Sequence, residues 1–293
     1  MGVEPICFVT MVRGDHAMLG KWIAHHSRHV SSRSALHVFL HGEDAELRRI
    51  SEECSVVTLP FDPTGAGFED ARRQLFFGLA GALRGYYRHV ITLDCDEFIV
   101  MDPAAGTSLA EHLEAHPFEG PALSPLGFDV VQRRRVENDP VDMSRPILGQ
   151  RSFGFLDGTY SKPCIFRRQP NGGTQHSLAG EEWEIDPTIY LFHFRFFDID
   201  LSGQLAKDRV AVVQSFNEHG TKHGIGTWTD RDVRLARALK LADARNCPEL
   251  TPEHVEAFHD CQIENYKSRG GKFMWKDPRR GPYRIPSRFE GIL

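Results

Sequence analysis

The chain has 293 residues, of which 41% are hydrophobic and 26% are charged. These proportions are typical of a globular protein, and they exclude a disordered chain and a fibrous one. The formal net charge of −5 argues against a nucleic-acid partner, because proteins that bind a phosphate backbone carry an excess of basic residues.

The first hundred residues alternate between short apolar runs and amphipathic stretches. Apolar runs rich in β-formers predict strands, and apolar residues spaced three or four apart predict helices. Strands are expected at Ile6–Met11, Leu36–Leu40, Val56–Leu59 and His89–Leu93, amphipathic helices at Met18–Val30 and Phe68–Leu83, and a polar helix at Asp44–Glu53. This order predicts an open, largely parallel sheet with helices on both faces, whose ligands bind outside the carboxyl ends of the strands.

The pattern is looser after Val100. A short helix capped by Ser108 is expected to run to His116, and the stretch Arg133–Thr159 is expected to be mostly loop. Further strands are expected at Ala122–Val131, Pro163–Arg167 and Ile189–Phe194, and helices at Ser202–His219, Thr229–Ala244 and Pro252–Lys267. We therefore predict a domain over residues 1–200 and a helical C-terminal extension over residues 201–293, ending in a basic, aromatic tail.

The six cysteines are scattered and form no C-x-x-C pair. This spacing favours free thiols in a reducing compartment over a disulfide framework. The N-terminal segment has no basic region followed by a long apolar stretch, and no apolar run approaches the about 20 residues of a membrane span. The protein is therefore expected to be cytoplasmic.

Three carboxylates follow the fourth predicted strand, in the segment Ile91–Val100 (ITLDCDEFIV). As a bare motif the pair Asp94/Asp96 is weak, because D-x-D occurs three times in this chain and about 1.4 copies are expected by chance. Its position distinguishes it, since apolar β-formers lie on both sides. In an extended segment the two aspartates project to one face, and Cys95 and Glu97 project to the other.

Such an arrangement of carboxylates favours a bound cation. Two carboxylates about 4 Å apart repel each other by about 4 kcal/mol at an effective dielectric constant of about 20. Oxygen ligands select a hard divalent ion, Mg²⁺ or Mn²⁺, which can neutralise a diphosphate leaving group. The simpler alternative is a solvated strand end with a capping carboxylate.

The segment Asp94–Phe98 resembles the D-x-D-E-F strand end of GT-A glycosyltransferases in the family-2-like and family-92-like group. Thr10–Asp15 resembles the opening strand and its signature, with Gly14 and Asp15 where the group has Asn and Glu. Tyr160–Pro163 resembles a lysine segment in the middle of the domain. Two later segments of the chain, Gln175-His176 and Phe192-His193-Phe194, resemble positions at which the group has histidine. The match runs from about Ile6 to Phe196, but the group's D-n-S-x-D after the second strand is absent, and His41–Asp44 stands in its place.

The resemblance implies a GT-A fold, with a mixed, mainly parallel sheet, in a glycosyltransferase of the hexosyltransferase type. It implies a UDP- or GDP-sugar donor, Mn²⁺ or Mg²⁺ as cofactor, and a glycan or lipid-linked acceptor, as in surface polysaccharide synthesis. The implied metal ligands are Asp94, Asp96 and His193. The side chains expected at the nucleotide-sugar are Thr10, Arg13, Asp15, Arg73, Asp94 and Lys162.

Structural alternatives stay open for several of these side chains. His193 can equally be a buried histidine bonded to a carbonyl, Arg13 a surface residue at a helix start, and Arg73 part of an exposed helix face. An inverting enzyme also needs a carboxylate base aimed at the acceptor hydroxyl, whereas a retaining one does not. The catalytic candidates are Glu97 and Glu182, with Glu181 and Asp129 as alternatives.

Two other functions also stay open. A sugar-phosphate nucleotidyltransferase would need a Gly-rich phosphate loop after the first strand, where this chain has MVRGDHAML with a single glycine. A non-catalytic carbohydrate-binding protein of the same fold would not need the D-x-D-E sequence. The tail Gly270–Leu293 is a candidate for contact with an anionic acceptor or with the inner face of a membrane, or for packing on the domain.

Overall fold

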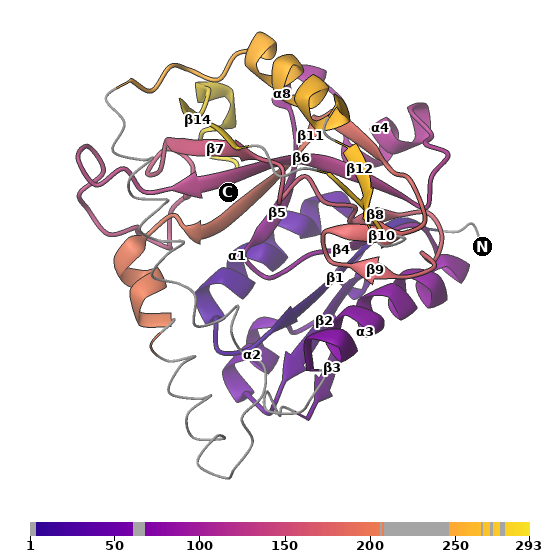
Figure 1. The fold of residues 1–293 in the computed structure, drawn as a ribbon. Coiled ribbons are helices and arrows are strands. Elements are labelled where there is room, and N and C mark those ends of the chain that lie inside the picture. Colours follow the sequence, from indigo (N-terminus) through magenta and orange to yellow (C-terminus); the bar gives the residue numbers. More distant parts are fainter. Residues whose placement is uncertain are drawn as a thin grey trace, which may run out of the picture.

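The computed structural model describes residues 4–60, 68–205, 207, 246–264, 266–269, 272–275 and 279–293. One large, strongly curled mixed sheet organises this part of the chain (Figure 1), in the strand order β14-β7-β6-β8-β4-β1-β2-β3, with β11 pairing with both β5 and β6. The strands are β1 Glu4–Val12, β2 Leu36–His41, β3 Ser55–Leu59, β4 Tyr87–Thr92, β5 Glu97–Met101, β6 Ala122–Val131, β7 Phe153–Asp157, β8 Ile165–Phe166, β11 Glu184–Phe196 and β14 Arg279–Arg284.

The four strands expected in the first hundred residues are confirmed, and they are parallel to one another in the order β4-β1-β2-β3. The remainder of the sheet is mixed: β8, β7, β14 and β5 pair antiparallel with their neighbours, whereas β6 and β11 are parallel. The protein is therefore a mixed α/β protein with a partly parallel sheet, and the carboxyl ends of β1 and β4 lie next to each other.

The helices of the N-terminal half begin at side chains that cap them. Asp15 accepts a hydrogen bond from the Met18 N–H at the start of α1 (His16–His26), and Asp44 accepts from two N–H groups at the start of α2 (Ala45–Ile50). Ser108 and Glu111 form a reciprocal capping box at the start of α4 (Leu109–Ala115), which confirms the expected cap. The long helix α3 (Phe68–Ala82) packs against β4 and leads into it.

The C-terminal part differs from a purely helical extension. The helix α8 (Pro252–Glu264) is present, but β14 joins the main sheet beside β7, and Phe289 is buried in the core. The strand β7 also lies inside the stretch that was expected to be mostly loop. Neither FGFLD nor RRGPYR has enough contiguous apolar residues to be recognised as a strand, and each is stabilised by pairing with a partner far away in sequence.

A second, four-stranded sheet connects the C-terminal segment to a central hairpin. Its order is β12 (Tyr266–Arg269), β13 (Lys272–Trp275), β10 (Ser177–Ala179) and β9 (Gly173–Thr174). The turn between β9 and β10 contains Gln175 and His176. The expected helix at Thr229–Ala244 and most of the one at Ser202–His219 lie outside the described residues, and the division of the chain at residue 200 stays a prediction.

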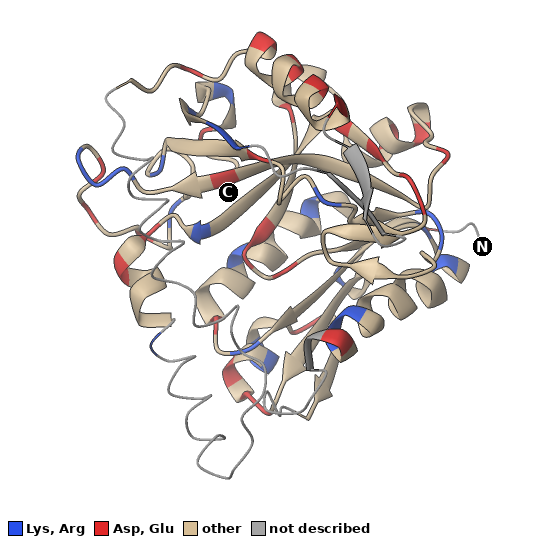
Figure 2. Ribbon diagram, viewed as in Figure 1, with Lys and Arg blue, Asp and Glu red and all other residues tan. Residues whose placement is uncertain are grey.

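The exposed side of α8 is acidic, with Glu253, Glu256, Asp260 and Glu264 (Figure 2). This row contrasts with the basic tail that was considered for contact with an anionic surface. Within the described residues, no helix has both the length and the apolar character needed to cross a membrane.

Histidines of α1 form part of the core. His26 is fully buried between the rings of Phe8 and Phe98, at centroid distances of 4.4 and 5.7 Å. Burial holds the pKa of His26 well below its usual range and lowers that of His25 to about 3. The same cause lowers the pKa of His29, His37, His41, His89 and His176, whereas the pKa of His193 is raised.

We expect the free energy of unfolding to fall as the pH drops from about 6.5 to 5.5. In the unfolded chain these histidines have pKa values near 6.5 and bind protons over this range, whereas their buried forms stay neutral. Each such histidine costs up to about 1.4 kcal/mol of stability per pH unit, and His193, with the opposite shift, offsets only one of them. Urea unfolding on either side of pH 6.5 measures how the free energy of unfolding changes with pH. His26→Gln should reduce this change by the contribution of one histidine. A midpoint that does not move would contradict the expectation.

Candidate functional site

The acidic segment Asp94–Glu97 is a turn between β4 and β5. The Glu97 N–H donates to the Asp94 carbonyl at 3.0 Å, and the Asp94 N–H donates to the Glu97 carboxylate at 2.8 Å. The expected extended backbone, with the two aspartates on one face, is therefore wrong. The physical reason is that the Glu97 side chain folds back and closes the turn.

Glu97 is held by a buried lysine. The Lys162 Nζ lies 2.6 Å from the Glu97 carboxylate, and the two side chains are 3% and 2% exposed. Burial lowers the pKa of Lys162, but the negative charges of Glu97 and Asp94 outweigh it and raise that pKa above its ordinary value. A side chain at Gly127 of β6 would overlap the backbone of Tyr160 and Ser161, so this glycine lets the segment that carries Lys162 approach the sheet. The sequence candidate Glu97 is thus a positioning residue of the turn and is not available as a base.

The Asp94 carboxylate accepts two hydrogen bonds from elements far away in sequence. Arg72 of α3 donates at 2.8 Å, and the side-chain amide of Gln175 donates at 3.3 Å. Burial opposes ionisation, but Arg72 and Lys162 hold the pKa of Asp94 well below its usual range. Asp94 is therefore a fixed anion, tied to a guanidinium and facing the turn between β9 and β10.

Arg72 is a site residue that the sequence did not reveal. The apolar stripe expected on α3 comprised Ala71, Leu75, Leu79, Ala80 and Leu83; Ala80 is buried as expected, Ala71 is exposed, and Phe76, outside the stripe, is buried as well. Arg72 lies one turn before Phe76 on the same side of the helix, and it is this arginine, rather than Arg73, that reaches Asp94. A test of alternative stripes on α3 could have found it, because Arg72, Phe76 and Ala80 share a face.

His193 faces Asp96 from the neighbouring strand. The His193 Nε2 lies 3.6 Å from the Asp96 carboxylate, and its Nδ1 lies 2.8 Å from a carboxylate oxygen of Asp129. The ring of Tyr160 stacks on His193 with centroids 3.8 Å apart. Burial lowers the pKa of His193, but the hydrogen bond to Asp129 and the charge of Asp96 raise it overall. His193 therefore has a fixed orientation, and neither Asp129 nor Tyr160 had been expected to set it.

The residues around Asp96 supply part of a ligand set for a divalent ion. In the described part of the chain, no group of three or more His, Cys, Asp or Glu side chains is arranged to hold a metal. Asp96 and His193 nevertheless lie close to where two ligands of one ion would lie. Adjacent ligands of one ion are about 3 Å apart when each bond is about 2.1 Å, and the His193 Nε2 lies 3.6 Å from the Asp96 carboxylate. A carboxylate on the other ring nitrogen, as Asp129 provides, is the usual partner of a metal-binding histidine. The third expected ligand, Asp94, is instead bonded to Arg72 and Gln175.

Three of the other predicted residues lie near the carboxyl end of β1. Thr10 is fully buried there, and its hydroxyl has no hydrogen-bond partner among the described residues. Arg13 donates to the His41 carbonyl at 3.0 Å, and the Asp15 carboxylate caps α1. The structure thus places all three at the edge of the sheet where a ligand of such a fold would bind.

Arg73 and Glu182 occupy different surroundings. Arg73 donates to Asp70 at 2.8 Å and to the Gly173 carbonyl, so it supports the hairpin of β9 and β10. Glu182 is exposed just before β11, at the opposite end of that strand from His193, which an extended strand places roughly 30 Å away. The structure does not bring Glu182 to the cluster.

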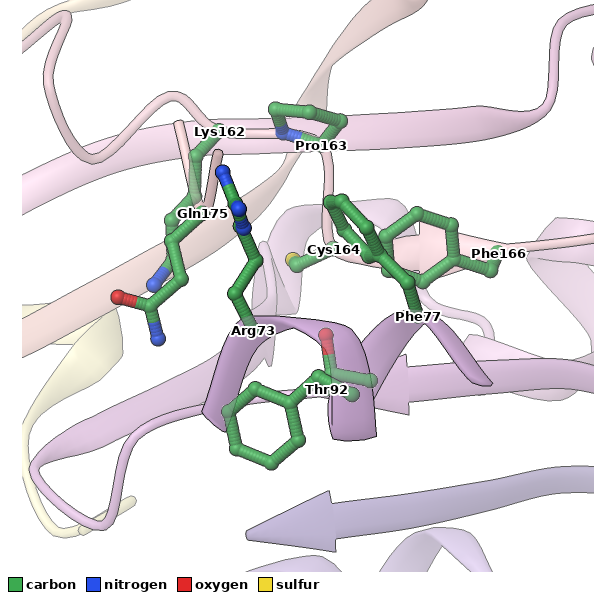
Figure 3. A pocket seen from close by; sticks show the side chains of 9 residues that line it. Arg73, Phe77, Thr92, Lys162, Pro163, Cys164, Phe166 and Gln175 are labelled. Atoms are coloured by element: carbon green, nitrogen blue, oxygen red, sulfur yellow. The ribbon is translucent and has the colours of Figure 1, made fainter. Parts of the chain in front are cut away.

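A narrow pocket opens beside the turn, between α3, β4 and β8 (Figure 3). Arg73, Lys162 and Gln175 lie on one side of it, and the aromatic rings of Phe77 and Phe166 lie on the other. Its lining residues are Arg73, Phe76, Phe77, Thr92, Lys162, Pro163, Cys164, Phe166 and Gln175. Polar groups thus reach the site from α3, the lysine segment and the hairpin.

No protein-family model matches the chain, and no curated protein sequence matches it either. An activity therefore has to be inferred from the chemistry of the site. At the site, the partly exposed Asp96 lies beside a His193 of fixed orientation. The neighbouring carboxylates Asp94 and Glu97 are paired with Arg72 and Lys162. Two of these side chains, Asp96 and His193, are of the kinds that bind divalent cations.

Proposed function

We propose that the chain is a metal-dependent glycosyltransferase of the GT-A kind. It would transfer a sugar from a UDP- or GDP-sugar to a hydroxyl of a glycan or lipid-linked acceptor, in the synthesis of a surface polysaccharide. The observation that carries the proposal is the pair Asp96 and His193 at the carboxyl end of β4, with Asp129 fixing the imidazole. The parallel strands β4-β1-β2-β3 support it, because ligands of such sheets bind at this edge.

The roles of the chain's own residues follow from their contacts. Asp96 and the Nε2 of His193 would hold Mn²⁺ or Mg²⁺, which when bound stabilises the charge of the departing nucleoside diphosphate. Lys162 and Glu97 keep the turn closed, so that Asp96 stays at the edge. Arg72 holds Asp94 in its ionised form beside the same edge. Contacts of Thr10, Arg13 and Asp15 with the nucleotide stay predictions.

None of the four sequence candidates for a base is available to an acceptor hydroxyl. Glu97 is paired with Lys162, and Asp129 with His193 and Arg279. Glu181 is paired with Arg168, and Glu182 is far from the cluster. The proposal therefore assigns no catalytic base to these residues.

The location of the protein belongs to the same proposal. A cytoplasmic enzyme acting on a lipid-linked acceptor would work at the inner face of the membrane. Two arginines of the tail expected to touch that surface form ion pairs within the protein instead. Arg279 binds Asp157 and Arg288 binds Asp102. Lys276 lies outside the described residues.

Release of nucleoside diphosphate from a panel of UDP- and GDP-sugars tests the proposal. In the presence of Mn²⁺ we expect slow hydrolysis of one donor even without an acceptor, because water can replace the acceptor hydroxyl. A chelator should abolish the release. If no sugar nucleotide is cleaved with either Mn²⁺ or Mg²⁺, with or without added acceptor glycans, the transferase assignment is wrong.

A further inference from the structure

A row of polar residues crosses the main sheet from the C-terminal strand to the acidic turn. In the pairing of β14 with β7, Arg279 lies opposite Asp157. Asp129 of β6 lies opposite His193 of β11, and His193 lies opposite Glu97 of β5. Between β7 and β6, Asp129 lies opposite Phe155, two residues before Asp157, so the Arg279 side chain has to reach diagonally across the sheet to join Asp157 with Asp129.

Arg279 bridges the two buried carboxylates of this row. Its Nε donates to Asp157 at 2.6 Å, and its terminal nitrogen lies 3.1 Å from one oxygen of Asp129. The side chains of Asp129 and Asp157 are 1% and 3% exposed. Two buried anions of this kind are stable only with a counter-charge, which the guanidinium provides to both. Arg279 also lies over the ring of Phe155, with its guanidinium carbon 5.3 Å from the centroid.

The second oxygen of Asp129 is the one that accepts from His193. Because Arg279 occupies one oxygen and His193 Nδ1 the other, the carboxylate has one fixed rotation. The ring of Tyr160 fixes the imidazole from its face. These contacts together direct the His193 Nε2 toward Asp96.

We propose that Arg279 is a positioning residue of the site, which acts through Asp129 to hold His193 with its Nε2 toward Asp96. Its role in activity rests on the proposed function, but its effect on the orientation of His193 does not. Through this contact the C-terminal strand β14, which begins at Arg279, completes a site whose other residues precede residue 194. No contact of Arg279 with substrate is implied.

The imidazole N–H signal of His193 in the full chain is the first test. A proton donated to a buried carboxylate gives a low-field, slowly exchanging signal, which His193→Gln assigns by removing it. Arg279→Met should broaden or abolish this signal. Asp157→Asn should retain it, because it leaves Arg279 on Asp129. A folded Arg279→Met protein with an unchanged signal would overturn the proposal, whether or not the chain is a transferase.

The second test is Mn²⁺ affinity, measured from the signal of free Mn²⁺ in electron paramagnetic resonance. Loss of a group behind a metal ligand weakens binding by about 10- to 100-fold, which we expect for Arg279→Met. The control is Arg288→Met, because Arg288 lies in the same C-terminal segment and pairs with Asp102 at 2.7 and 2.8 Å, outside the row. It should retain the affinity of the unmodified protein.

Arg279→Lys decides the outcome if Arg279→Met does not fold. A lysine has no planar fork and can serve one carboxylate well but not both. We expect it to fold, to bind Mn²⁺ several-fold more weakly and to show faster exchange of the His193 proton. An affinity and an exchange rate equal to those of the unmodified protein would overturn the proposal. If the unmodified protein binds no Mn²⁺, the proposed function fails, and the N–H signal still decides the role of Arg279.

Discussion

Asp96→Asn is expected to lower the rate of nucleotide-sugar cleavage by about 10²- to 10³-fold or more. Asp96 is the partly exposed carboxylate that faces His193, and the amide of asparagine removes its charge while keeping its shape. Loss of a group that stabilises developing charge in a transition state typically has an effect of this size. Release of nucleoside diphosphate at saturating donor, followed over a range of Mn²⁺ concentrations, measures it. Part of the loss should be recovered at high Mn²⁺, since the affinity for the ion is what the substitution weakens.

The chain offers a matched control for this substitution. Asp200 is the second member of another D-x-D pair, and its 88% exposed side chain pairs with Arg134 away from the turn. Asp200→Asn should leave the rate unchanged. If Asp96→Asn keeps more than about a tenth of the activity at a Mn²⁺ concentration that only just saturates the unmodified protein, Asp96 does not hold the ion.

Lys162→Met is expected to destabilise the protein by about 3–5 kcal/mol. The substitution leaves Glu97 buried with no counter-ion, where burial already raises its pKa, and breaking a buried pair from one side typically costs this much whether the carboxylate stays charged or takes up a proton. The cost should be present at neutral pH, where Lys162 is charged because Glu97 and Asp94 raise its pKa. Chemical denaturation of the variant and of the unmodified protein measures the difference.

The double variant Glu97→Gln/Lys162→Met distinguishes loss of a charge partner from loss of packing. It removes both charges, so it should recover part of the stability that the single variant loses. The exposed pair Arg88 and Glu114 supplies the comparison, since Arg88→Met should cost less than about 1 kcal/mol. A double variant as unstable as Lys162→Met alone would show that the charge of Glu97 is not the cause.

Local patterns were sufficient for the parallel half of the fold. The strands β1 to β4 have apolar runs long enough to be recognised, the helices between them were expected where they lie, and Ser108 begins its helix as expected. The strands β7 and β14 could not be found in this way. They are short, contain charged residues and Gly–Pro, and are stabilised by pairing with strands far away in sequence, β14 with β7 and β7 also with β6.

At the site, the sequence predicted which residues would matter better than it predicted how they pair. Asp96 and His193 are brought together as expected, 3.6 Å apart. The pairing of Lys162 with Glu97 and of Arg72 with Asp94 was not predictable, because each joins elements that meet only in the folded sheet. The turn at Asp94 was missed for a related reason: it is closed by the Glu97 side chain, and the same letters would suit an extended strand.

Calorimetry of UDP and GDP binding, with and without Mn²⁺, is the most direct test of a metal-dependent nucleotide-sugar site at Asp96 and His193. We predict that one of the two nucleotides binds in the presence of Mn²⁺, that a chelator abolishes the binding heat, and that Asp96→Asn abolishes it as well. If neither nucleotide binds with the metal, or if binding is equally tight in the chelator and in the variant, the proposed site is wrong.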